Sequence, residues 1–123
     1  HFPTPQQLSE ADENMLSPLR AGFRSKYLID CGNKVFSGEV KLEEIKVSEI
    51  VDARKNLMKI KGVGPKVAEC ALLYGMYKTE AFPVDVWIKR VLSEYYPEGF
   101  PQEFSEYQGI AQQYLFHYIR KGL

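Results

Sequence analysis

The stretch Leu57 to Trp87, LMKIKGVGPKVAECALLYGMYKTEAFPVDVW, decides how this 123-residue chain folds. Apolar positions on both sides of Gly62-Val63-Gly64 follow helical spacing. The glycines stand where the backbone must bend sharply or approach a partner closely. The pattern therefore predicts two helices joined by a turn of only a few residues, which is a helix-hairpin-helix.

Lys66 is the first candidate functional residue. Pro65 suits the first position of the second helix, because its φ is already helical and its missing N–H is not needed there. Lys66 then lies in the first turn, beside unpaired backbone N–H groups and the positive end of the helix dipole. It either binds a phosphate or has an amine that loses its proton easily enough to act as a nucleophile. From position alone, a solvated surface lysine is the commoner outcome.

Asp85 is the second candidate. Pro83 disfavours helix at the residue before it, and Asp85 precedes the amphipathic run WIKRVL. Asp85 is therefore predicted to be a helix N-cap. Capping alone would explain its presence, because Asp is among the best capping residues.

The other helices are predicted from apolar spacing and capping residues, and no segment shows sustained period-two alternation. The first prediction is a short turn at the Thr4 capping box, a second start signal at residues 9–12, and then a helix to about residue 19. The other predicted helical ranges are 23–36 closed by Gly38, a weak turn at 42–45, 49–59, 65–77, a helix capped by Asp85, and 103–121. On the helix 65–77, the face with Val67, Cys70, Ala71 and Tyr74 is apolar. The fold class is all-α, a helical bundle forming one domain over residues 1–123.

Composition limits the function. The 16 Lys and Arg balance the 16 Asp and Glu, so any binding to DNA must be local rather than driven by a basic field. Cys31 and Cys70 are too few for a disulfide framework and lack CxxC spacing, which favours a reducing compartment. The sequence shows no long apolar run or signal-peptide pattern, which predicts an intracellular protein without membrane contact. Because residue 1 is His, we expect a piece of a longer protein.

The hairpin GVGPK and the run FPVDVW closely resemble the helix-hairpin-helix/GPD superfamily of DNA glycosylases. With KVAEC, GFRSKY and AQQYLF, the match is similar to the 8-oxoguanine DNA glycosylase/lyase branch over residues 2–120. The resemblance implies the C-terminal catalytic helical part of a monomeric base excision repair enzyme, which acts on damaged double-stranded DNA and resides with the genome. It implies no iron–sulfur cluster, since the four cysteines of endonuclease III-like relatives are missing after Leu92.

The resemblance also implies a mechanism. In the family, the lysine at Lys66 attacks C1′ of the extruded nucleotide, displaces the damaged purine and forms a Schiff base that permits β-elimination. The aspartate at Asp85 stabilises positive charge on the sugar and assists proton transfer. Relatives that lack lyase activity keep the aspartate without the lysine, so the Lys66–Asp85 pair selects the bifunctional branch.

The damaged-base pocket is implied by three further positions. In the family, the residues at Cys70 and Phe116 sandwich the extruded base, while the glutamine at Gln112 hydrogen-bonds the purine. Cys70 follows Lys66 by four residues on one helix face, and Gln112 precedes Phe116 by four on another. Each also has a plain interpretation. Cys70 could be a small buried hydrophobe, Phe116 a core aromatic and Gln112 a solvated amide.

The remaining contacts implied by the resemblance concern DNA and a cation. Phe23 would wedge into the duplex and Arg24 would address the opposite base, although core packing and a surface charge also explain the pair. The amides of Gly62, Gly64 and Val67 would bind phosphate, and the carbonyls of Met58, Ile60 and Val63 a monovalent cation (K⁺ or Na⁺). Trp87 replaces a histidine that some eukaryotic members use for phosphate. Two other functions stay open: a non-catalytic DNA-binding module, and a glycosylase for another lesion.

Overall fold

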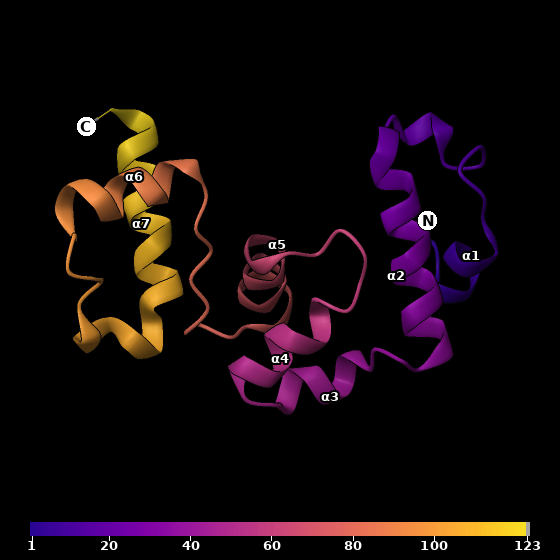
Figure 1. The fold of residues 1–123 in the computed structure, drawn as a ribbon, viewed down its shortest axis with the longest axis horizontal. Helices are drawn as coiled ribbons and strands as arrows, with labels where there is room; N and C mark the ends of the chain where they lie inside the picture. Colours follow the sequence, from indigo (N-terminus) through magenta and orange to yellow (C-terminus); the bar gives the residue numbers. More distant parts are fainter. Residues whose placement is uncertain (123) are drawn as a thin grey trace. The chain divides into compact units, whose positions relative to one another are not determined.

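The computed structural model describes residues 1–122, and every regular element in that range is a helix, which confirms the all-α prediction (Figure 1). The chain divides into two compact units, His1–Val63 and the residues from Gly64 onward. We describe each unit by itself, and the single domain stays a prediction. None of the helices described is long and apolar enough to cross a membrane.

The capping box at Thr4 is present as predicted, and the longer helix predicted after it is not. In α1 (Pro5–Glu10) the Thr4 hydroxyl accepts a hydrogen bond from the Gln7 N–H, and the Gln7 side chain accepts one from the Thr4 N–H. The prediction of a helix that follows this turn and reaches residue 19 is wrong, because the chain forms turns and then the short 3-10 helix η1 (Ser17–Leu19). Asp12 caps a local turn at Met15, and Pro18 has no N–H to extend an α-helix.

The rest of the first unit consists of three helices. A 3-10 turn (Gly22–Arg24) leads into α2 (Ser25–Ser37), which ends at Gly38 with φ +84°, as predicted. A Cβ at Gly32 of α2 would overlap Leu8, so α1 packs closely on α2. Then follow α3 (Leu42–Val47) and α4 (Ile50–Leu57), both shown in Figure 1. The buried apolar residues here include Val40, Ile45, Ala53, Leu57 and Ile60.

The second unit begins with α5 (Pro65–Cys70), which continues as a π-helical turn over Ala71–Gly75. The predicted helix 65–77 is thus present, but its apolar face is not its buried face, because Val67 and Tyr74 are 48% and 61% exposed. The buried face instead carries Ala68, Leu72 and Leu73. The wider π turn changes which residues share a face, and fixed helical spacing cannot anticipate this.

Two further α-helices complete the second unit. Asp85 caps α6 (Val86–Tyr95), and a 3-10 helix (Gln102–Tyr107) precedes α7 (Gln108–Lys121), so the last α-helix starts five residues later than predicted. The start of α7 is fixed to the segment before α6: the Gly109 N–H donates to the Thr79 carbonyl at 2.8 Å, and Gln108 Nε2 donates to the Glu80 carbonyl at 2.7 Å. These bonds hold α7 beside the loop that leads to Asp85.

Candidate functional site

Lys66 lies in the first turn of α5, as predicted. Gly64 is the N-cap and Pro65 occupies the first turn, while no side chain caps this helix end. Lys66 is exposed, and Cys70 follows one α-helical turn later with a half-buried side chain. The start of α5 therefore presents backbone N–H groups, an ammonium and a thiol within two turns.

Asp85 caps α6 with its carboxylate. Oδ1 accepts a hydrogen bond from the Ile88 N–H at 2.8 Å, and the backbone carbonyl accepts one from the Lys89 N–H at 2.9 Å. The side chain is half-buried. Capping occupies Oδ1 and fixes the orientation of the carboxylate, which is the geometry that a positioned acid–base group requires.

Two buried side chains hold the loop before Asp85. The Glu69 carboxylate accepts a hydrogen bond from the Phe82 N–H at 2.8 Å, and Gln112 Nε2 donates one to the Pro83 carbonyl, also at 2.8 Å. Glu69 is 7% exposed and Gln112 only 3%, so the interpretation of Gln112 as a solvated amide is wrong. The loop that carries Asp85 is thereby tied to α5 on one side and to α7 on the other.

Tyr74 is a residue of this site that the sequence pattern did not indicate as functional. Its hydroxyl accepts a hydrogen bond from Gln113. The pKa of Tyr74 is raised, first by partial burial and then by the charges of Cys70 and Asp85, while the Gln113 hydrogen bond opposes the shift. The available signal was its spacing, because Tyr74 follows Cys70 by four residues just as Cys70 follows Lys66.

Phe116 lies on α7 and is half-buried, so it is not a fully buried core aromatic. The guanidinium of Arg120 lies over its ring at 5.7 Å from the centroid and over the Trp87 ring at 5.4 Å. Trp87 comes from the first turn of α6. Arg120 thus connects the aromatic residue of α7 to the helix that Asp85 caps, through cation–π contacts.

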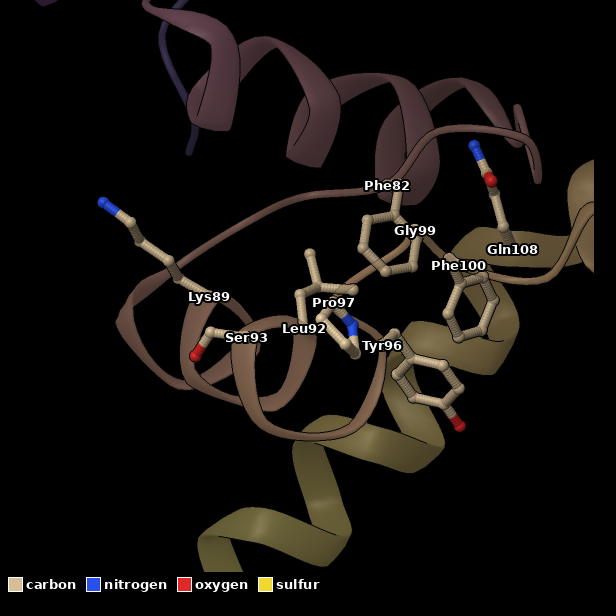
Figure 2. Close-up of a pocket in the computed structure, with 9 residues that line it drawn as sticks. All are labelled: Phe82, Lys89, Leu92, Ser93, Tyr96, Pro97, Gly99, Phe100 and Gln108. Carbon is tan, nitrogen blue, oxygen red and sulfur yellow. The ribbon is translucent and has the colours of Figure 1, made fainter.

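A pocket of about 440 Å³ lies elsewhere in the second unit, and none of the predicted site residues lines it. Figure 2 shows the rings of Phe82, Tyr96 and Phe100 gathered around it, while Lys89 extends away from them. The Phe100 centroid lies 5.2 Å from those of Phe82 and Tyr96. This pocket belongs to an aromatic cluster and is distinct from the predicted base pocket.

In the first unit, Phe23 is 62% exposed, so its interpretation as a core residue is wrong. Its ring contacts Tyr27 edge-on, with centroids 5.9 Å apart, and the Arg24 guanidinium lies 5.3 Å from its centroid. The 3-10 turn before α2 therefore presents an aromatic ring and an arginine together at the surface. This arrangement is compatible with the predicted wedge.

The turn after α4 is held by α2. Asp30 Oδ2 accepts hydrogen bonds from the Lys61 N–H and from Lys34 Nζ, both at 2.7 Å. The Val63 N–H donates to the Ile60 carbonyl at 3.1 Å, and Gly62 has φ +87°. Carbonyl oxygens are suitable donors for K⁺ or Na⁺, and the Ile60 oxygen keeps a second lone pair. The donor chemistry fits the predicted cation, which stays a prediction.

The chain is similar to known DNA glycosylase/lyases. No family model matches the chain. A probable N-glycosylase/DNA lyase of Methanothermobacter thermautotrophicus is 37% identical over 124 residues, which cover 93% of this chain and 39% of the relative. The N-glycosylase/DNA lyase of Saccharomyces cerevisiae is 36% identical over 106 residues, covering 77% of this chain and 28% of the relative. An 8-oxoguanine glycosylase/lyase of Clostridium acetobutylicum, in complex with double-stranded DNA containing cytosine opposite 8-oxoguanine, superposes with a TM-score of 0.85 and 39% identity.

Over most of its length, the chain is similar to a part of these N-glycosylase/DNA lyases and 8-oxoguanine glycosylase/lyases. It spans 39% of the archaeal relative and 45% of the solved bacterial chain, and the latter match covers 98% of this chain. All five residues predicted for catalysis and for the base pocket lie in the unit from Gly64 onward: Lys66, Cys70, Asp85, Gln112 and Phe116. That unit therefore carries every residue predicted for catalysis and for the base pocket.

Proposed function

We propose that this chain forms the catalytic part of a bifunctional DNA glycosylase/AP lyase that removes 8-oxoguanine from duplex DNA in base excision repair. One observation carries the proposal: Lys66 stands in the first turn of α5 while Asp85 caps α6, both within one compact unit. A non-catalytic DNA-binding hairpin requires neither residue. The similarity to 8-oxoguanine glycosylase/lyases supports the substrate.

In the proposed reaction, the target nucleotide leaves the stack, since C1′ is inaccessible inside the duplex. The unprotonated amine of Lys66 attacks C1′, the bond to the purine breaks and the base departs with a proton. Ring opening of the sugar gives a Schiff base between Lys66 and C1′. Loss of a C2′ proton then expels the 3′ phosphate by β-elimination, and hydrolysis of the imine frees the lysine.

Asp85 is proposed to stabilise the positive charge that develops on the sugar and to take part in the proton transfers. Its cap bond to the Ile88 N–H and the bonds from Glu69 and Gln112 to the preceding loop support this role, because they fix the carboxylate before substrate arrives. Preorganisation matters here, since a fixed charge needs no reorientation during the reaction.

The extruded base is proposed to stack between Cys70 and Phe116, with Gln112 on its polar edge. Gln112 uses one N–H for the Pro83 carbonyl, and its Oε1 accepts a bond from Gln113 Nε2 at 2.5 Å. A primary amide has two N–H groups and two lone pairs on oxygen. One donor and one acceptor position of Gln112 are therefore left for a purine.

DNA binding is proposed to be local, since formal charges cancel over the chain. The protein is proposed to act as a monomer. Phe23 would fill the gap left by the extruded nucleotide and Arg24 would address the opposite base. The amides of Gly62, Gly64 and Val67 would bind phosphate. The carbonyls of Met58, Ile60 and Val63 would hold the cation.

Borohydride trapping tests this function. The full-length protein should become covalently attached to a duplex containing 8-oxoguanine, because borohydride reduces the Schiff base. Lys66→Gln should bind the duplex but neither release the base nor trap, whereas Lys89→Gln, on the exposed surface of α6, should trap like the wild type. Undiminished trapping by Lys66→Gln would remove Lys66 from the nucleophile role. Binding by the wild type without excision would favour the non-catalytic module.

A further inference from the structure

A chain of hydrogen bonds connects Tyr74 to the loop that carries Asp85. Gln113 Nε2 donates both to the Tyr74 hydroxyl and to Gln112 Oε1, and Gln112 Nε2 donates to the Pro83 carbonyl. The two glutamines are neighbours on α7, Tyr74 belongs to the π turn, and Pro83 precedes Asp85 by two residues. Three segments of one unit thus meet in one network.

The direction of every bond in this network follows from Pro83. A backbone carbonyl only accepts, so Gln112 must present its NH₂ group to Pro83 and its Oε1 to Gln113. Gln113 must in turn present its NH₂ group to Gln112 Oε1, and the same nitrogen reaches the Tyr74 oxygen. Reversing either amide would bring two acceptors together. The Tyr74 oxygen therefore accepts, and its own proton is not used within the network.

We propose that the Tyr74 hydroxyl is a substrate-contacting specificity residue, which donates its proton to an acceptor atom on the extruded base. This inference rests on the proposed function and adds a residue to the same site. An 8-oxopurine carries carbonyl oxygens that accept such a bond. Tyr74 lies two turns after Lys66, on the helix that presents the nucleophile, and follows Cys70, the proposed stacking residue, by four residues.

The network also explains why a phenol suits this position. Tyr74 is 61% exposed as a residue, yet its hydroxyl is held by Gln113, which leaves the O–H bond fewer directions to adopt. Burial and the nearby Asp85 raise the pKa of Tyr74, so the hydroxyl keeps its proton over the pH range in which DNA repair enzymes are assayed. A donor held in place favours a base with an acceptor at that edge and disfavours one without it.

The first experiment separates contact with the base from every other role of Tyr74. In the full-length protein, Tyr74→Phe should lower single-turnover excision of 8-oxoguanine by roughly tenfold, the upper range for a neutral hydrogen bond. Its AP lyase rate on a duplex with a preformed abasic site should stay within about twofold, because no base is present there to bind. The control is Tyr77→Phe, since Tyr77 is 84% exposed on the same helix end, and it should leave both rates unchanged.

The second experiment tests the direction of the network. Gln113→Glu replaces the donor with an acceptor, so the Tyr74 proton turns toward residue 113 and away from the base. This variant also loses the bond to Gln112 Oε1, so it should lose at least as much excision as Tyr74→Phe. Adding Tyr74→Phe to Gln113→Glu should cost no more than about twofold further. Additive losses would overturn the proposed direction.

The outcomes keep the two proposals apart. If the wild type neither excises 8-oxoguanine nor traps with borohydride, the proposed function fails. If the wild type excises and traps while Tyr74→Phe is unimpaired, only the role of Tyr74 fails. Equal losses by Tyr74→Phe in excision and in the lyase reaction would likewise overturn contact with the base, since they indicate a structural or DNA-backbone role.

Discussion

The ring of Tyr27 lies so close to the α-carbon of Gly62 that a Cβ at position 62 would overlap it. Gly62 also has φ +87°, which L side chains rarely adopt. Next to it, the Lys61 N–H donates to Asp30 at 2.7 Å. The turn that the sequence predicts from its glycines is therefore fixed by two residues of α2. Tyr27 leaves no room for a side chain at position 62, and the Asp30 carboxylate accepts the hydrogen bond from the Lys61 N–H.

Gly62→Ala should destabilise the protein by about 2–4 kcal/mol, since a left-handed residue with a side chain and overpacking against Tyr27 both cost free energy. Gly64→Ala is the matched control. Gly64 has φ −94° and open space around its α-carbon, so its free energy of unfolding should change by less than about 1 kcal/mol. Chemical denaturation measures both. Equal stability of the two variants would contradict the role assigned to Tyr27.

Features fixed by neighbouring residues could be predicted from the sequence. Thr4 and Asp85 cap their helices and Gly38 ends one, because each acts on backbone groups within a few residues. The hairpin turn at Gly62 is predictable for a similar local reason, because glycine readily adopts the positive φ that the turn needs. The sequence therefore predicts that Lys66 and Asp85 lie at helix starts, as they do, while resemblance to a family implies their roles.

Features that depend on distant partners could not be predicted. The π turn and the buried face with Leu72 reflect packing within the second unit, which helical spacing does not encode. Gln112 is buried because the Pro83 carbonyl, 29 residues away, accepts its hydrogen bond. Tyr74 joins the site through the same network, so neither its exposure nor its partner Gln113 could be inferred from the pattern.

Asp30 predicts how stability depends on pH. Its pKa is lowered, first by the hydrogen bond from Lys34 and then by that from the Lys61 N–H. A lowered folded-state pKa means that the stabilisation is present above the unfolded value of 3.8 and disappears as pH falls through the lower folded value. Between pH 5 and 2, the wild type should therefore lose more stability than Asp30→Asn, which has no carboxylate to protonate. Denaturation at several pH values checks this, and parallel curves would contradict it.

Asp85 combines two roles that a single substitution can separate. Both capping and catalysis require an oxygen at this position, and only catalysis requires a negative charge. Asn caps helices about as well as Asp, so Asp85→Asn should cost only a few tenths of a kcal/mol through the lost charge–dipole interaction. Asp85→Ala is the control for the cap, because it removes the bond to the Ile88 N–H and should cost about 1 kcal/mol.

The amide of Asp85→Asn can accept the cap bond but cannot stabilise a developing cation or exchange a proton as a carboxylate does. We therefore expect this variant to melt near the wild-type temperature while its single-turnover excision of 8-oxoguanine falls by at least ~100-fold, the lower end for a positioned acid–base group. Thermal unfolding and excision are measured on one preparation, so that a folding defect cannot pass for a catalytic one. Normal excision together with normal stability would reduce Asp85 to a helix cap and would leave Lys66 without its partner in the proposed reaction.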